Sequence, residues 1–231
     1  MEKRKTMTKL IGISGKIGSG KDTFAEIIRL LTSSSYLTNQ TIEHFLRNPN
    51  PNVTRTEWRV QKFAGKLKEV ASLLTGIPVY KFEDQDFKKT NLPEEWNVWH
   101  PNLDRSEPMT VRELLQKLGT EAMRNGLHTN AWVNATFANY DYYSKWLITD
   151  VRFPNEAAAI IEKGGLLVRL HRNSETGDHP SETALDNYDF QIVIENTGSL
   201  TELIDKAREF CVKYNLLDKQ DEYPPHTEGF F

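Results

Sequence analysis

A short glycine-rich run near the start of the chain constrains the possible fold more than any other feature. The run GKIGSGKDT covers residues 15–23, follows the apolar segment 10–13, and precedes apolar residues at helical spacing, namely Phe24, Ile27, Ile28 and Leu31. Glycines let successive backbone N–H groups point inward, and a helix N-terminus adds partial positive charge. With the mobile charge of Lys21, this pattern predicts a phosphate-binding loop between a strand and a helix. The alternative is a flexible glycine turn.

The loop departs from the most common phosphate-loop sequence at one position. Asp22, rather than Ser or Thr, follows the lysine, and the hydroxyl comes one residue later at Thr23. In P-loop NTPases the hydroxyl directly after the lysine holds Mg²⁺. Asp22 could hold the metal through water or could cap the helix, where an acid in the first turn is favourable. We favour the cap and assign a phosphate contact to Thr23. The departure, with the lack of an Asn-Lys-x-Asp motif, argues against a GTPase.

The composition is that of an ordinary globular chain and excludes several classes of partner. A length of 231 residues suffices for one α/β domain with insertions or two small domains. The net charge of −3 gives no general reason to bind nucleic acid or an anionic membrane. The single cysteine, Cys211, fits a core position in a reducing compartment. No apolar run has the length of a membrane span or signal core, so we expect a cytoplasmic protein.

Strand and helix patterns alternate along the rest of the chain. This alternation predicts right-handed βαβ units, and therefore an α/β fold of three layers (α/β/α) with a mainly parallel sheet. Residues 34–57 are expected to form a loop, 78–108 an irregular insertion, and 218–231 a loose tail. We expect strands at 9–14, 59–64, 145–150, 166–170 and 191–194, and helices at 22–33, 66–75, 110–124, 130–143, 157–163 and 199–214.

Two polar segments that follow strands carry candidate catalytic residues. Asp150 ends a buried strand, where ligands bind in open α/β sheets, and would face magnesium or its waters. Arg152 could contact a substrate phosphate through two hydrogen bonds. The alternative is that Asp150 caps the next helix and Arg152 pairs with Glu156. After the strand that contains Arg169, we expect a mobile flap on which Arg172 stabilises a transferring phosphoryl group and excludes water. An exposed loop with incidental charge is the alternative.

Two helices could supply the site of a phosphate acceptor. Lys66 and Lys68 lie near the start of a predicted helix, where cations are unfavourable, which suggests that an anion is received there. On the next helix Gln116 could bind a base edge, while Arg112 or Arg124 could bind a phosphate, with Thr120 on the same polar side. The alternative is a solvated helix face. Several aromatic residues, Trp132 among them, could offer a stacking surface, although aromatics at this spacing are more often core.

Taken together, these segments resemble the bacteriophage deoxynucleoside monophosphate kinase family. The DVRFPNE and LQKLGT runs are much more selective than the phosphate loop, which many families share. The animal-type phosphomevalonate kinases are similar in their Gly-Lys-Asp, Leu-Lys-Glu and Ser-Glu segments, so a kinase for another small phosphorylated acceptor is the alternative. The matching residues, in order, are Ser14-Gly15, Gly20 to Thr23, FAGKLKE at 63–69, RELLQKLGTE at 112–121, DVRFPNE at 150–156, HPSE at 179–182 and IENTG at 194–198.

The resemblance implies transfer of the γ-phosphate of ATP, with Mg²⁺, to a deoxynucleoside 5′-monophosphate. It implies one P-loop kinase domain of the nucleoside-monophosphate-kinase type, and it suggests a homodimer, whereas the residues themselves do not reveal the oligomeric state. Its core would be residues 8–33, 58–76, 145–170 and 189–215, its acceptor-binding region 34–57 and 77–144, and its lid 171–188. A nucleotide switch without an acceptor, or a nucleic-acid-associated phage protein, are further alternatives. The arginines at 169–172 argue against the first and the negative net charge against the second.

Residue roles follow from the same resemblance. The catalytic set is Lys21, Asp150, Arg152 and Arg172. Magnesium is expected on Asp150, or on Asp22 through water. ATP is expected to contact Gly15, Lys16, Gly18, Ser19, Gly20, Lys21, Asp22 and Thr23 through its phosphates, and Asn196 and Gly198 near adenine. The acceptor is expected to contact Lys66, Lys68, Arg112, Gln116, Thr120, Arg124, Trp132, Arg152 and Arg169.

Overall fold

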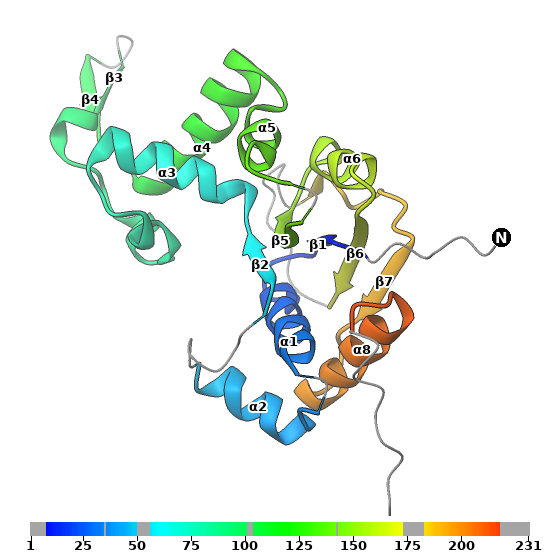
Figure 1. The fold of residues 1–231 in the computed structure, drawn as a ribbon. Coiled ribbons are helices and arrows are strands. Elements are labelled where there is room, and N and C mark those ends of the chain that lie inside the picture. Colours follow the sequence, from blue (N-terminus) through cyan, green and yellow to red (C-terminus); the bar gives the residue numbers. More distant parts are fainter. Residues whose placement is uncertain are drawn as a thin grey trace, which may run out of the picture. The chain divides into compact units, whose positions relative to one another are not determined.

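The computed structural model describes residues 8–34, 36–49, 56–100, 104–141, 143–172 and 183–217, which divide into two compact units. One unit, called here the sheet unit, contains the described residues of Met1–Gln61 and Tyr140–Phe231. The other, called here the inserted unit, is Lys62–Asn139. Figure 1 shows both with their elements labelled. Each unit has its own hydrophobic core.

A five-stranded sheet forms the centre of the sheet unit. All four strand pairings are parallel, which confirms the predicted mainly parallel sheet. The middle strand is buried along its whole length because strands flank it on both sides and helices cover both faces. In spatial order the strands are β2 (Trp58–Gln61), β5 (Lys145–Val151), β1 (Leu10–Ser14), β6 (Leu166–His171) and β7 (Ile192–Glu195).

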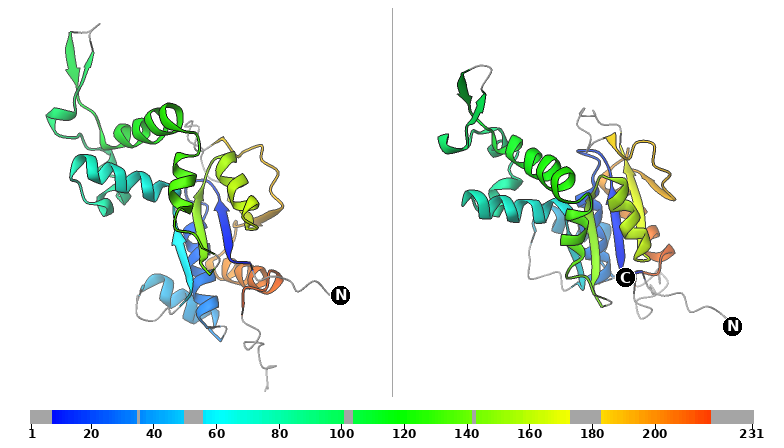
Figure 2. Two further views of the ribbon diagram at one scale, coloured as in Figure 1. Left: turned by 45° about the horizontal axis from the view of Figure 1, so that its top comes forward. Right: turned by 90° about the horizontal axis from the view of Figure 1, so that it is seen from above.

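Helices cover the two faces of this sheet. On one face α1 (Lys21–Ser33) packs beside α8 (Leu200–Lys213), and α6 (Pro154–Glu162) covers the other, as Figure 2 shows. The alternation of side chains along β1 explains the two layers. Ile11 and Ile13 point into the core shared with α1 and α8, whereas Gly12 faces Ile160 of α6 so closely that no side chain would fit. The predicted three-layer α/β/α arrangement is confirmed.

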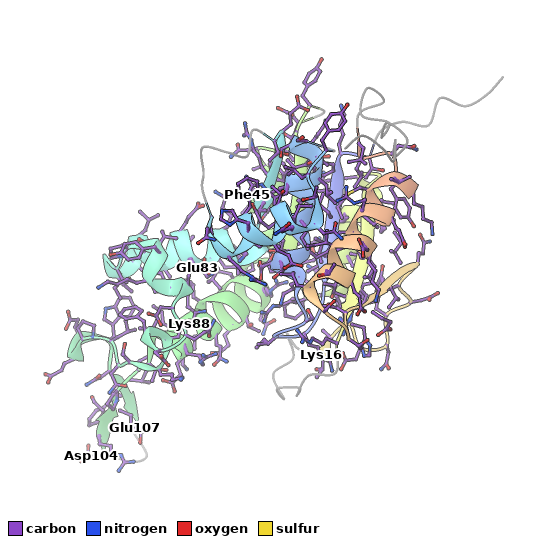
Figure 3. All side chains as sticks on the ribbon, turned by 90° about the horizontal axis from the view of Figure 1, so that it is seen from below. Lys16, Phe45, Glu83, Lys88, Asp104 and Glu107 are labelled. Carbon is purple, nitrogen blue, oxygen red and sulfur yellow. The ribbon has the colours of Figure 1, made fainter. Side chains whose placement is uncertain are left out.

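One helix of the sheet unit was not expected. The prediction of a loop over 34–57 is wrong for α2 (Asn39–Arg47), which Thr38 caps by accepting a hydrogen bond from the amide of Thr41. Three apolar residues at helical spacing, Ile42, Phe45 and Leu46, pack into or against the core shared with α1 and α8. Phe45 is labelled in Figure 3. Because polar residues surround these three apolar residues, their helical spacing was not recognised in the sequence.

Several helix boundaries differ from the prediction for local reasons. The strand expected at 59–64 ends at Gln61, and α3 (Phe63–Thr75) begins three residues before the predicted start. Helix α6 also begins three residues early, because Pro154 suits the first helical position. Gly76 and Gly164 have positive φ angles of 72° and 75° and follow α3 and α6, as the sequence predicted for helix ends.

The inserted unit packs around Ala71, Phe82, Leu92, Val111 and Leu114. The stretch expected to be irregular, 78–108, contains three short 3₁₀ turns and a two-stranded antiparallel hairpin that was not predicted. Its elements after α3 are η1 (Val79–Glu83), η2 (Phe87–Lys89), η3 (Glu94–Trp96), β3 (Val98–His100), β4 (Arg105–Glu107), α4 (Val111–Gln116), η4 (Lys117–Leu127) and α5 (Ala131–Phe137). Where one helix was expected over 110–124, α4 continues into η4, which is a π-helix. Helix α5 is shorter than the predicted 130–143.

The predicted division of the chain can be compared with the two units. Residues 34–57 were expected with the acceptor-binding region, and their helix α2 packs within the sheet unit. The core was expected to include residues up to 76, and α3 belongs to the inserted unit. The substrate role of each region stays a prediction. Across the described residues, none of the helices combines the length and apolarity that crossing a membrane requires.

Candidate active site

The phosphate loop lies at the carboxyl edge of the sheet, beside the point where strand order reverses. The chain leaves β1 toward β2 on one side, and leaves β6 toward β7 on the other. Ligands of open α/β sheets bind in the crevice at such a point. The loop follows β1, and Arg172 follows β6. Asp150 is next to last in β5, where Val151 pairs with Ser14, so these residues reach the same edge.

Two left-handed glycines shape the loop. Gly18 and Gly20 have φ angles of 77° and 89°, and the amide of Ser19 donates to the carbonyl of Lys16 at 3.1 Å. Gly20 is the cap residue of α1, and its carbonyl accepts from the amide of Phe24 at 2.8 Å. Its conformation is one that other residues adopt only with strain. The predicted strand, glycine loop and helix are therefore all present.

A buried hydroxyl in the loop is available to an additional ligand. Ser19 is 1% exposed, and its Oγ has no hydrogen-bond partner among the described residues. Leaving a buried polar group unpaired costs about 1–3 kcal/mol. An oxygen of a bound phosphate could accept from this hydroxyl. The residues present therefore fit the triphosphate of ATP, which the sequence predicted at this loop.

The two charged residues at the start of α1 make contacts within the sheet unit. The ammonium of Lys21 donates to the carbonyl of Lys16 at 3.3 Å, so its charge turns back over the loop. Asp22 lies in the first turn, as expected for an acid that favours the helix N-terminus. The prediction that the Asp22 side chain caps this helix is wrong, because α1 has no side-chain cap hydrogen bond at its N-cap residue, Gly20, among the described residues. The Asp22 carboxylate instead accepts from the buried hydroxyl of Thr149 on β5 at 2.9 Å. Sequence reasoning missed Thr149, whose only signal was its position beside Asp150.

The segment after β5 is fixed by a buried carboxylate. Glu156 is 1% exposed, and its Oε2 accepts from the backbone amides of Arg152 and Phe153 at 2.8 and 3.1 Å. These two hydrogen bonds use the main chain of Arg152 and Phe153. Both Asp150 and Arg152 are partly buried. Their catalytic roles stay predictions.

Asn196 braces the phosphate loop from β7. Its side-chain amide donates to the carbonyl of Ser19 at 2.8 Å and lies so close to Gly20 that a Cβ there would clash with it. Asn196 is 6% exposed, and its backbone amide donates to the carbonyl of His171 at 2.7 Å. The sequence predicted that Asn196 and Gly198 lie near adenine. The structure places Asn196 against the loop, and Gly198 is exposed.

Arg169 also contacts the loop region rather than open solvent. Its guanidinium donates to Ser14 Oγ at 3.0 Å and to Asp186 at 3.2 Å, and Lys16 donates to the other oxygen of Asp186 at 3.1 Å. Lys16 is labelled in Figure 3. Sequence reasoning assigned Arg169 to the acceptor and missed Asp186, because an acid in a polar turn gives no distinct signal.

In the inserted unit, two lysines proposed to receive an anion have carboxylate partners. Lys66 pairs with Glu69 at 2.7 Å, and Lys68, which is 7% exposed, pairs with Glu83 at 2.6 Å. Burial alone would raise the pKa of Glu83, but the hydrogen bond and charge of Lys68, with the charges of Lys62 and Lys88, hold that pKa below its ordinary value. Glu83 and Lys88 are labelled in Figure 3.

The remaining predicted acceptor residues differ widely in exposure. Trp132 is 3% exposed and donates from its indole to the carbonyl of Gly119 at 2.9 Å, so it packs as a core residue of the inserted unit. Arg112 is exposed and donates to Gln85 at 3.4 Å. Gln116 is exposed, whereas Thr120 and Arg124 are partly buried on η4. Their contacts with an acceptor stay predictions.

Part of the predicted lid, residues 173–182, lies outside the described residues, and so does the HPSE run within it. Searching the described positions for three or more His, Cys, Asp or Glu side chains arranged to hold a metal gives none. Magnesium in kinases is commonly held by one or two carboxylates together with substrate phosphates, so Asp150 and Asp22 fit that chemistry.

A phosphate loop at the reversal point of a parallel sheet, in a fold of three layers, defines the class of P-loop proteins, which bind the phosphate groups of nucleotides. Residues 60–207 match the family described as deoxynucleotide monophosphate kinase. The chain therefore belongs to the deoxynucleotide monophosphate kinase family, whose activity is that of an ATP-dependent phosphotransferase. This result confirms the family and the enzyme class predicted from the sequence.

Individual viral proteins support the same assignment. A protein of Acanthamoeba polyphaga mimivirus, provisionally named deoxynucleotide monophosphate kinase, is 30% identical over 212 residues, which cover 84% of this chain and 91% of that protein. The deoxynucleotide monophosphate kinase of Enterobacteria phage T4 is 26% identical over 240 residues, covering 87% and 97%. The deoxynucleoside-5′-monophosphate kinase of Escherichia phage T5 is 26% identical over 232 residues, covering 78% and 86%.

Proposed function

We propose that this chain transfers the γ-phosphate of ATP to a deoxynucleoside 5′-monophosphate and releases ADP and the deoxynucleoside diphosphate. The observation that carries the proposal is the phosphate loop at the reversal point of the sheet, with the buried Ser19 hydroxyl that has no hydrogen-bond partner in the described part of the chain. Membership of the family supports the choice of acceptor. An oxygen of the acceptor phosphate attacks the γ-phosphorus of ATP, and the bond from that phosphorus to the bridging β-phosphate oxygen breaks.

In this proposal the side chains position and neutralise charge. Lys21 leaves the carbonyl of Lys16 and binds the β- and γ-phosphates together with the loop amides. Arg152 and Arg172 stabilise the charge that spreads over the transferring group. Asp150, or Asp22 through water, would hold Mg²⁺, which when bound offsets the charge of the phosphate oxygens.

The acceptor needs little activation. Its phosphate is already an anion, so the enzyme has to align it with ATP and exclude water rather than remove a proton. A covalent enzyme intermediate is therefore unnecessary. The acceptor residues of the inserted unit, among them Arg112, Gln116 and Arg124, belong to this proposal, as does the lid over residues 171–188.

The proposal is tested by ADP release in the presence of a panel of acceptors. The panel contains the four common deoxynucleoside monophosphates, their ribose counterparts and phosphomevalonate. We expect at least one deoxynucleoside monophosphate to stimulate ADP release strongly. Stimulation by phosphomevalonate alone would instead identify the other kinase class, and slow hydrolysis that no acceptor changes would identify a nucleotide switch.

The same assay tests Lys21. We expect Lys21→Ala to lower kcat at least about 100-fold, because removing one preorganised charge from a phosphoryl-transfer site typically has an effect of that order. Lys213→Ala removes an exposed lysine from the end of α8 and serves as the matched control. Circular dichroism should show that both variants fold. Turnover of Lys21→Ala within a few-fold of the parent chain would remove Lys21 from the mechanism.

We also propose a homodimer, as the family resemblance suggests. From the composition and charge of the sequence, we propose that it works in the cytoplasm with neither nucleic acid nor membrane as a partner. Light scattering of the purified chain tests the dimer. A single species at the mass of one chain, at concentrations used in the kinetic assay, would contradict it.

A further inference from the structure

An ionic link contacts the phosphate loop on both sides of Gly15. Arg169 donates to Ser14 Oγ at 3.0 Å and to Asp186 Oδ1 at 3.2 Å, and Lys16 donates to Asp186 Oδ2 at 3.1 Å. Ser14 and Lys16 flank Gly15 in the sequence. The contacts therefore form a closed path from the end of β1, through Arg169 and Asp186, back to the first turn of the loop.

The fold places both members of the link. Arg169 lies opposite Ser14 in the pairing of β6 with β1, and its guanidinium lies 5.4 Å from the centre of the Phe190 ring. Asp186 lies in a turn closed by a hydrogen bond from its amide to the carbonyl of Thr183 at 2.9 Å. The buried side chain of Leu185 anchors this turn in the sheet unit.

The surroundings of the link make it firmer than a pair on the open surface. The side chains of Arg169, Lys16 and Asp186 are 14%, 21% and 34% exposed, so water screens their charges only in part. Gly15, which lies between Ser14 and Lys16, packs closely against β6. A Cβ on Gly15 would lie only 2.8 Å from the carbonyl oxygen of Leu170. Two features therefore hold the first turn of the loop. One is the close packing of Gly15 against β6, and the other is the ionic link that contacts Ser14 and Lys16.

We propose that Arg169 and Asp186 are positioning residues for the phosphate loop. They hold Ser14 and Lys16 so that the loop keeps the shape that receives the triphosphate of ATP. Asp186 also joins this shape to the turn that follows residues 173–182. This inference rests on the proposed use of the loop for ATP. It differs from the role that the sequence suggested for Arg169, which was contact with the acceptor.

The two roles predict different kinetic effects. Asp186→Asn keeps the size of the side chain but removes its charge and one of its two acceptor oxygens, so both cations lose their charged partner and one of them loses its acceptor. We expect the KM for ATP, and the Kd for ATP measured by calorimetry without acceptor, to rise about tenfold, the usual effect of losing a charged hydrogen bond. The KM for the deoxynucleoside monophosphate should stay within twofold. Arg169→Lys should act in the same direction, because a single ammonium nitrogen would replace the two guanidinium nitrogens, Nη1 and Nη2, that reach Ser14 and Asp186.

A double-mutant cycle separates the link from direct contact between Lys16 and phosphate. If Lys16 acts through Asp186, the double variant Lys16→Met, Asp186→Asn should bind ATP about as well as the weaker single variant. Asp186→Glu, which keeps the charge, should recover most of the affinity. Glu26→Gln is the matched control, because the Glu26–Arg29 pair at 2.6 Å has similar exposure, at 36% and 26%. Its ATP affinity should stay within twofold.

Three outcomes would overturn the inference: unchanged ATP affinity in folded Asp186→Asn and Arg169→Lys, additive losses in the double-mutant cycle, or a rise in the acceptor KM alone. Arg169→Lys tests the link from the β6 side, so it decides the question if Asp186→Asn does not fold. Failure of the proposed function is a separate result, because it would appear as a parent chain that no deoxynucleoside monophosphate stimulates. Calorimetry with ATP needs no acceptor and so keeps the two failures apart.

Discussion

At the scale of single residues, Asn196 fixes the end of the phosphate loop at Ser19 and Gly20. Its amide is buried, donates to the carbonyl of Ser19, and fills the space beside Gly20. Two separate reasons therefore favour glycine at position 20. The backbone there has a positive φ, and the Asn196 side chain occupies the space that a Cβ would fill. The loop shape thus depends on a residue that follows β7 near the end of the chain.

We expect Asn196→Ala to destabilise the chain by about 1–2 kcal/mol and to raise the KM for ATP several-fold. The buried Ser19 carbonyl would lose its partner, and the loop would lose a contact that limits its motion. Urea unfolding and steady-state kinetics measure the two effects. Asn48→Ala is the control, because Asn48 makes the same kind of bond to a backbone carbonyl on an exposed helix end, and should cost under about 0.5 kcal/mol. Equal losses of stability in the two variants would contradict the role given to Asn196.

Contacts between distant residues explain which parts of the site the sequence could predict. The loop and Lys21 were predictable because the glycines, the preceding strand and the following helix are neighbours in the chain. The bond from Thr149 to Asp22 joins residues 127 positions apart, and that from Lys16 to Asp186 joins residues 170 apart. Only the arrangement of the strands brings such residues together, so no local pattern marks Thr149 or Asp186.

At the scale of elements, the sequence predicted helix and strand order well and helix type poorly. The spacing over 110–124 indicated a helix but could not show the wider turn of η4, because both kinds of helix keep apolar residues on one side. Within η4, the carbonyl of Gly119 accepts a hydrogen bond from the Trp132 indole. Such π-helical segments occur frequently at functional sites. The predicted acceptor residues Thr120 and Arg124 lie on this segment.

Within the inserted unit, the pair of Lys68 and Glu83 joins α3 to η1. Lys68 is almost fully buried, whereas the side chain of Glu83 is 54% exposed. We expect Glu83→Gln to cost about 1–2 kcal/mol in urea unfolding at pH 7, because it leaves a buried ammonium without its charge partner, and Lys68→Met to cost less. Glu69→Gln breaks the more exposed pair with Lys66 and should cost under about 0.5 kcal/mol.

The pH dependence of unfolding stability is a second test of the pair formed by Lys68 and Glu83. The pKa of Glu83 is lower in the folded chain than its ordinary value of 4.5, so its ionised form stabilises the fold above that pH. As the pH falls below 4.5 and through the lowered pKa, Glu83 takes up a proton and this contribution disappears. The stability difference between the parent chain and Glu83→Gln should therefore shrink. A difference that persists unchanged to pH 3 would show that charge is not its source.

At the scale of the whole molecule, the largest core lies between the sheet and the helices α1, α2 and α8. The apolar runs of the strands made the parallel sheet predictable, since buried parallel strands are apolar on both faces. The sequence left open one α/β domain with insertions or two small domains, and it did not predict the bounds of the two compact units. Its boundaries fall at residues 62 and 139, where the sequence shows neither a Gly- or Pro-rich linker nor a change in composition.

Cys211, the single cysteine of the chain, can report on the opening of this core. It is fully buried on α8, and burial raises the pKa of its thiol to about 12 from an ordinary value of 9. Because only the thiolate reacts, we expect a disulfide reagent at pH 8 to modify the folded chain at least about 100-fold more slowly than the urea-unfolded chain. Cys211→Ala gives the background. Rapid, complete modification of the folded chain would contradict the burial of Cys211.

The reactivity of the Cys211 thiol should also respond to ATP that binds at the phosphate loop. Since α1 begins at the loop and packs beside α8, ATP that binds the native chain should also lower the population of the open, reactive form. At 100 times its Kd, ATP stabilises the native state by about 2.7 kcal/mol, which slows modification through global opening about 100-fold. Above pH 9 the folded chain loses stability as the unfolded thiol ionises first, and this loss should be absent in Cys211→Ala. Modification that ATP does not slow would mean that Cys211 becomes exposed by a local motion of α8 that leaves the loop intact.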